Sequence, residues 1–252
     1  MPPRRPVRPR PIYRRNADDR IRRLERAAAG GDLLAHSTLL RERLRLGLVT
    51  PERIAMAAYL GHPAARAIGI PPLTRIRAEP WDYGSFSLEL LNNGPVSPRE
   101  ATLFAADCCM RSLAAFGLSH REEGTYETAV AAVEAARTWV LGGIPTPGPG
   151  ELGRVLFNLI PRSELRDDVS TFSACQAAAD GCRSKPSEIT RDVVRYTLSA
   201  VRQNLLGAGV TLRDVPESVL LHAQQARTME ARWQDAHFAK ALLEPEWPMV
   251  TL

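Results

Sequence analysis

Aromatic residues are scarce in this chain of 252 residues, at 6% of the sequence. Runs that alternate β-branched and polar residues, the pattern typical of half-buried strands, are also missing. Alanine, leucine, valine and arginine recur in nearly every segment instead, and this composition suits closely packed helices better than strands. The hydrophobic share of 44% is enough for a buried core. The sequence therefore predicts an all-α fold.

Long apolar runs are absent as well. No segment reaches the roughly 18 to 20 consecutive apolar residues that a membrane-spanning helix needs. Paired arginines occur near the start, but the residues after them are rich in arginine and aspartate, so they do not match the apolar region of an export signal. We expect a cytoplasmic protein that does not contact a membrane.

Cysteine is limited to four positions, Cys108, Cys109, Cys175 and Cys182, and none of them forms a C-x-x-C pair. We expect reduced thiols that pack as small hydrophobic side chains rather than a disulfide framework. Cys175 and Cys182 are two helical turns apart, too far for adjacent metal ligands. His120 is the only histidine placed to join the first pair, and a solvated loop position explains it better. The sequence predicts no metal site and no cofactor.

Catalytic motifs are missing too. The chain has no G-x-S-x-G, no H-E-x-x-H and no glycine-rich phosphate loop, since prolines interrupt the glycines of residues 144–151. Acidic or acid–histidine clusters are limited to Asp167 with Asp168 and Asp235 with His237, and both patterns usually lie on solvated helix faces. We predict that the protein is not an enzyme, and an enzyme of an unrecognised helical class is the third alternative.

Positive charge is present in quantity, but only at one end. Residues 1–26 contain ten arginines and three acidic residues, a net charge of +7. Because the whole chain carries +5, the remainder carries −2. This asymmetry indicates that an acidic partner would meet the N-terminal segment and not the folded body.

The first fifteen residues alternate proline with arginine. Proline removes amide donors and favours an extended backbone, so we expect residues 1–15 to form a disordered arm. The arm offers arginines for phosphate contacts but only Tyr13 for base stacking. A solubilising leader without a ligand is the alternative. The candidate nucleic-acid-binding residues are Arg4, Arg5, Arg8, Arg10, Arg14 and Arg15.

Helix signals follow the arm in close order. Asn16 is a predicted N-cap, Asp32 caps a helix that stops at Gly47, and Thr50 with Pro51 starts one that stops at Gly61. In the helix that Asp32 caps, the charged residues, Arg43 included, are expected to face water.

A shift of thirty residues aligns Gly31 with Gly61 and also matches apolar positions, which indicates a weak helix–turn–helix repeat. Residues 16–68 are therefore predicted to form a helical-hairpin subdomain. The prolines of residues 69–80 predict a linker after it.

The strongest helix start lies at residues 97–100, where Ser97 and Glu100 form a capping box with a proline at the first helical position. Asp107 and Arg111 in this helix are expected to pair on its solvated face. Thr125 is a predicted cap for a further helix that closes at residues 142–143.

The remaining chain is also expected to be helical. Helices are predicted near residues 151–160, 164–181, 188–206 and 216–243, after a loop at 144–151. Together with a short helix within residues 81–91 they would form a helical bundle domain over residues 81–252.

One resemblance concerns the segment that begins at Thr50 and Pro51 and continues through Ile54 and residues 57–62, AAYLGH. It resembles the helix–turn–helix part of a single ankyrin repeat, over about residues 50–68. Such helix pairs commonly serve protein recognition.

A second resemblance covers about residues 97–206. It rests on two alanines that are followed, after one residue, by Cys108 and Cys109, on Tyr126 and Trp139 with the alanines between them, and on the alanine-rich segment at residues 174–179. These features resemble the helical putative immunity proteins of bacterial polymorphic toxin systems. The resemblance implies a protein that binds and neutralises a partner without catalysis, and it implies no catalytic residue.

The sequence thus favours a non-enzymatic protein-binding or adaptor protein, with an immunity-like role as its specific form. The alternative is a nucleic-acid-associated structural protein in which the basic arm makes phosphate contacts and the helical body supplies placement.

Overall fold

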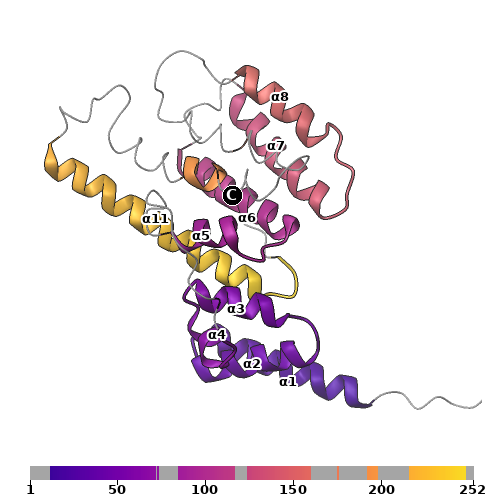
Figure 1. Ribbon diagram of the computed structural model, residues 1–252. Helices are drawn as coiled ribbons and strands as arrows, with labels where there is room; N and C mark the ends of the chain where they lie inside the picture. Colours follow the sequence, from indigo (N-terminus) through magenta and orange to yellow (C-terminus); the bar gives the residue numbers. More distant parts are fainter. Residues whose placement is uncertain are drawn as a thin grey trace, which may run out of the picture.

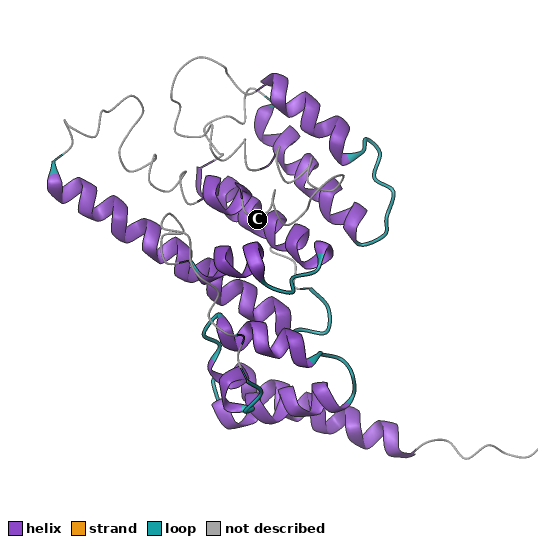
Figure 2. Ribbon diagram, in the orientation of Figure 1, coloured by secondary structure: helices purple, strands orange, loops and turns teal. Residues whose placement is uncertain are grey.

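The computed structural model describes residues 12–71, 73, 85–116, 124–159, 175, 192–197 and 216–247. Within these ranges every regular element is a helix and none is a strand, as Figure 2 shows, so the all-α prediction is confirmed. Cys175 and residues 192–197 are also helical. The helices labelled in Figure 1 are α1 (Ile12–Ala29), α2 (Leu33–Arg45), α3 (Pro51–Tyr59), α4 (Pro63–Ala67), α5 (Phe86–Asn93), α6 (Pro98–Phe116), α7 (Thr125–Val140), α8 (Pro149–Leu159) and α11 (Glu217–Leu243).

The thirty-residue repeat is present in the backbone. The turns α1–α2 and α3–α4 contain Gly31 and Gly61 with φ of 86° and 94°, a left-handed conformation that glycine adopts without strain. The amide of Asp32 donates to the carbonyl of Ala27, and thirty residues later His62 makes the same bond at 2.9 Å. Asp32 and His62 then cap α2 and α4. The two turns therefore share one hydrogen-bond pattern.

The helices pack in an order that differs from their order in the sequence. Helix α1 packs on α2, α2 on α4, α4 on α3, and α3 on α11. Helix α11 also contacts α5 and α6, while α6 packs on α7 and α7 on α8. Figure 1 accordingly shows α1 and α2 at one end of the molecule, α7 and α8 at the other, and α11 crossing between them.

Helix α11 joins the N-terminal hairpins to the rest of the core. One continuous cluster of buried side chains includes Leu40 of α2, Ile54 of α3, Phe104 of α6 and Phe238 of α11. The Phe104 and Phe238 rings stack with centroids 4.3 Å apart. The division into a subdomain at residues 16–68 and a bundle at 81–252 stays a prediction, but the two parts share this core.

Several predicted helix ends are confirmed by their hydrogen bonds. The Ser97 hydroxyl accepts from the Glu100 amide at 3.2 Å, and the Glu100 carboxylate accepts from the Ser97 amide at 3.1 Å, which completes the capping box. Asp32 and Thr50 cap α2 and α3 as expected. Helix α11 begins at Glu217, within one residue of the predicted start.

Other ends differ from the prediction. Helix α1 begins at Ile12, so Asn16 lies inside it and does not cap it, and the predicted arm overlaps α1 by four residues. The cap of α7 is Gly124, while Thr125 is already helical and buried. Helix α8 begins at Pro149, inside the predicted loop, because proline suits the first turn of a helix. The predicted helices at 164–181 and 188–206 lie outside the described residues, except for Cys175 and residues 192–197.

Arg43 is buried, so the prediction that it faces water is wrong. Its guanidinium donates to the carbonyl of Leu243 at 2.9 Å and pairs with Glu25 at 3.2 Å and Glu244 at 3.0 Å. The last carbonyls of a helix have no partner within it, and a cation complements the negative end of the helix dipole. Arg43 therefore fixes the C-terminal end of α11 against α2.

Among the described helices, none is long and apolar enough to cross a membrane.

Two histidines meet where α2 lies beside the start of α4. The rings of His36 and His62 are 5.0 Å apart in an edge-to-face arrangement, and His62 Nδ1 accepts from the amide of Ala65 at 3.4 Å. Burial, and then the neighbouring His36, lower the pKa of His62 from 6.5 to about 4. The neutral imidazole is thus the form that caps α4.

We expect the protein to lose stability as the pH falls from 6.5 to 4, in part because of His62. Over this range the unfolded chain binds a proton at residue 62 that the folded chain excludes. The contribution of His62 to the free energy of unfolding is therefore fully present above pH 6.5 and is lost as the pH falls toward 4. The contribution is about 1 to 2 kcal/mol, less than the full shift implies because the ring is only partly buried. Denaturant unfolding of His62→Asn, which retains a capping side chain, should vary less with pH than that of the wild type.

His222, an exposed histidine on α11, supplies the matched control. His222→Asn should keep the wild-type pH dependence. An unchanged pH dependence in His62→Asn would contradict the assignment to His62.

Candidate functional site

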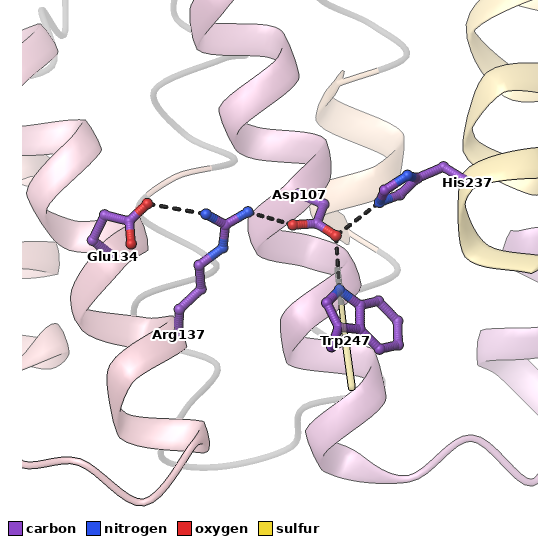
Figure 3. Close-up of polar contacts among 5 residues, drawn as sticks. All are labelled: Asp107, Glu134, Arg137, His237 and Trp247. Atoms are coloured by element: carbon purple, nitrogen blue, oxygen red, sulfur yellow. Dashed lines mark hydrogen bonds and ion pairs between the residues drawn. The ribbon is translucent and has the colours of Figure 1, made fainter. Parts of the chain in front are cut away.

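A set of buried polar side chains surrounds Asp107 of α6, as Figure 3 shows. Asp107 is fully buried and accepts hydrogen bonds from Arg137 of α7, from His237 Nε2 of α11 at 2.8 Å and from Trp247 Nε1 at 2.8 Å. A carboxylate only accepts, so His237 Nε2 carries a proton. We call these four residues the Asp107 cluster.

Arg137 connects the Asp107 cluster to the surface. Its guanidinium is buried, and Nη1 donates to Glu134 at 3.0 Å while Nη2 bonds to Asp107. Glu134 is one helical turn earlier on α7 and is exposed at 44% of its side chain. The buried Asp107 charge is therefore balanced by a buried guanidinium that solvated Glu134 also contacts.

A second row of contacts lies along α6 and α11. The Arg111 guanidinium lies 4.1 Å from the ring centre of Trp233, and the Trp233 ring stacks on His237 at 4.9 Å. Arg111 Nε also donates to Glu230 at 3.0 Å. Burial raises the pKa of Glu230, and the bond from Arg111 opposes this shift. The predicted Asp107–Arg111 pair on a solvated face is thus wrong, because each residue has a partner on another helix.

The sequence pattern predicts that Asp235 lies on a solvated helix face. In the structure it has hydrogen-bond partners on another helix instead. It is buried and accepts from the amides of Phe86 and Ser87, at 3.2 and 2.7 Å, and from the Ser87 hydroxyl at 2.6 Å. Burial raises the pKa of Asp235, and the bonds from Ser87 partly offset the rise. Asp235 therefore binds the amino-terminal end of α5, while His237, two residues later, turns toward Asp107.

The Asp107 cluster has the residue types of an acid–base site, but its carboxylate is not accessible from solvent. Asp107 has no exposed surface, and its carboxylate is occupied by three donors. The cavity that touches Trp247 has a volume of about 170 Å³, below the roughly 300 to 1,000 Å³ of small-molecule sites. It is lined by Arg53, Ser97, Arg99, Glu100, Leu103, Pro245 and Trp247. The arrangement positions α6, α7 and α11, and the Asp107 carboxylate has no surface exposed to solvent.

The cysteines do not add a reactive or metal-binding group in the described residues. Cys108, Cys109 and Cys175 are buried and free, and burial raises the pKa of the Cys108 and Cys109 thiols well above the ordinary value. Such thiols are poor nucleophiles. No group of three metal-binding side chains occurs in the part of the chain that the structure describes. Cys182 and His120 lie outside that part.

Other predicted site residues are also outside the described residues. These are Asp167 and Asp168 and the arm residues Arg4, Arg5, Arg8 and Arg10. Positions 14 and 15 of the arm belong to α1.

The sequence carried one signal for the Asp107 cluster. Asp107 stands alone in the otherwise apolar run AADCCM of residues 105–110. An acidic residue within a buried stripe requires a buried partner, and this requirement points to an arginine on a neighbouring helix. The identity of that partner depends on the packing of α6 against α7.

No protein-family model, curated protein or solved structure matches this chain.

Proposed function

We propose that this chain is a non-enzymatic binding protein whose partner is another protein. The observation that carries the proposal is the exposure of large apolar side chains at the α7–α8 end of the molecule. Ile144, in the connection between the two helices, is 86% exposed, and Trp139 and Leu141 beside it are about half exposed. Val155 and Leu159 are exposed on α8.

Helix α8 lies at one end of the row of packed helices, and this position supports a binding role for its exposed side chains. In stacked helical proteins the terminal helix normally presents a polar outer face, and α1 does so with its arginines. Helix α8, at the opposite end, presents Val155 and Leu159. Exposed aromatic and aliphatic side chains that gather at one end are typical of protein-interaction surfaces.

The Asp107 cluster supports binding without catalysis. Each charged group in it is neutralised inside the fold, and this favours a rigid placement of α6, α7 and α11. Rigid helices lower the entropic cost of presenting a surface to a partner. Under this proposal the partner is a toxin that binding neutralises, as the resemblance to helical putative immunity proteins implies.

Affinity purification of the full chain from its native host tests the proposal. The variant Leu141→Asp/Ile144→Asp places two charges in the α7–α8 surface, and we expect it to recover at least about tenfold less of the partner than the wild type. The matched control Leu34→Asp/Met229→Asp places two charges at exposed apolar positions of α2 and α11 and should recover the partner normally.

Equal recovery by all three proteins would exclude the α7–α8 surface. Elution of the wild type alone as a monomer would oppose a protein-binding function.

A further inference from the structure

The outer face of α1 is basic. Ile21, Leu24 and Ala28 of this helix are partly buried on the side of α2, whereas Arg22, Arg23 and Arg26 are exposed. Figure 1 shows α1 at the end of the molecule, beyond α2. The exposed face of α1 is therefore open to a partner.

Most acidic groups near α1 already have other partners. Glu42 pairs with Arg20 at 3.1 Å and with Arg45 at 2.8 Å, and Glu25 pairs with the buried Arg43. Within the described residues, Arg22, Arg23 and Arg26 form no ion pair with an acidic side chain. Their charges are thus available to an external anion.

The arginines also follow a helical row. Arg22 and Arg26 have the i, i+4 spacing of one helical face. Arg26 Nε donates to the backbone carbonyl of Arg22 at 3.3 Å, so the Arg26 side chain turns back toward residue 22. Like charges at i and i+4 destabilise a helix unless an anion lies between them.

A terminal helix that only faces solvent does not require a row of arginines. Mixed charges make a helix face polar without repulsion, whereas here three exposed arginines lie beside one glutamate, Glu25, which pairs with Arg43. By sequence, the eleven residues before α1 add Arg4, Arg5, Arg8 and Arg10 without an acidic residue. The segment before α1 therefore adds only positive charge to the chain.

We propose that α1 uses Arg22, Arg23 and Arg26 to bind the phosphate backbone of double-stranded nucleic acid. Guanidinium groups bind phosphate oxygens in a two-pronged geometry, and a line of them matches a linear polyanion better than the compact acidic patch of a protein. The scarcity of aromatic residues in this region disfavours stacking on single-stranded bases. Binding is independent of base sequence and separate from the proposed protein-binding surface at α7–α8.

Binding of the full chain to a mixed-sequence DNA duplex of about 20 base pairs, measured by fluorescence anisotropy from roughly 50 to 200 mM salt, tests this proposal. The variant Arg22→Gln/Arg26→Gln should reduce the slope of log affinity against log salt by about 2, close to 0.9 for each phosphate that an arginine no longer neutralises. The matched control Arg154→Gln/Arg232→Gln, at exposed positions of α8 and α11, should keep the wild-type slope. Glutamine preserves helix propensity, and equal circular dichroism confirms folding.

An absence of salt-dependent binding by the wild type, or an equal slope in wild type and variant, would overturn the proposal. So would tighter binding of polyglutamate than of a duplex of equal total charge, because carboxylates and not phosphates would then be the preferred anions.

Discussion

Replacement of Arg137 by methionine is expected to lower the free energy of unfolding by about 3 to 5 kcal/mol. The substitution keeps an unbranched side chain of similar length but removes the cation that bonds to Asp107. Asp107 would remain fully buried as an anion, held only by the hydrogen bonds from His237 and Trp247. Urea denaturation followed by circular dichroism measures the loss.

Two further variants separate the buried charge from other effects of the substitution. Arg137→Met/Asp107→Asn removes both charges and should be more stable than Arg137→Met alone, because the neutral amide costs less to bury than a carboxylate. Glu134→Gln removes the exposed partner of Arg137 and should cost at most about 1 kcal/mol. A loss below about 1 kcal/mol in Arg137→Met would show that the ion pair does not hold α6 and α7 together.

Replacement of Phe238 by alanine is expected to cost about 3 to 5 kcal/mol. Phe238 is fully buried on α11, stacks on Phe104 and contacts the ring of Trp247. The substitution would open a cavity where α11 joins the hairpins to the bundle. Unfolding of the whole core should therefore become less cooperative. Thermal and urea unfolding measure the change.

Phe86 provides a matched aromatic control on α5. It is 40% exposed, and the ring that it contacts belongs to Tyr59. Phe86→Ala should cost less than half as much as Phe238→Ala, because solvent already reaches part of the ring. Equal losses in the two variants would contradict the central position of Phe238.

Helix ends are predictable where their signals are local. The Ser97 capping box, the Thr50 cap and the left-handed glycines at 47 and 61 each depend on residues within one turn, and all are present. The start of α1 differs from its prediction because Asn16 can cap a helix but is also tolerated within one.

Partners distant in sequence are not predictable in the same way. Helical spacing pairs Asp107 with Arg111, four residues away, but its partners in the structure are 30, 130 and 140 residues away. The same kind of pattern places Arg43 in solvent, but it bonds to Leu243 across 200 residues. Spacing on one helix identifies its faces, and only the packing of helices decides which charge meets which.

The buried stripe of α11 explains the error at Asp235 and His237. Gln234 and Asp235 are buried among alanines and leucines, so the polar residues of this helix do not mark its solvated side. Each has a fixed partner elsewhere, Thr197 for Gln234 and Ser87 for Asp235. Polar residues in this stripe select neighbours and so specify the packing of the helices.

The late position of α11 in the chain has a consequence for biosynthesis. Of the described helices it is the last to leave the ribosome, yet it packs on α3, α5 and α6. The hairpins and α6 must therefore remain with uncovered apolar faces until residue 243 emerges. Translation at about 5 to 20 residues per second leaves that surface open for roughly ten seconds or more after α3 is complete. Completion of α11 is therefore the step that covers these faces.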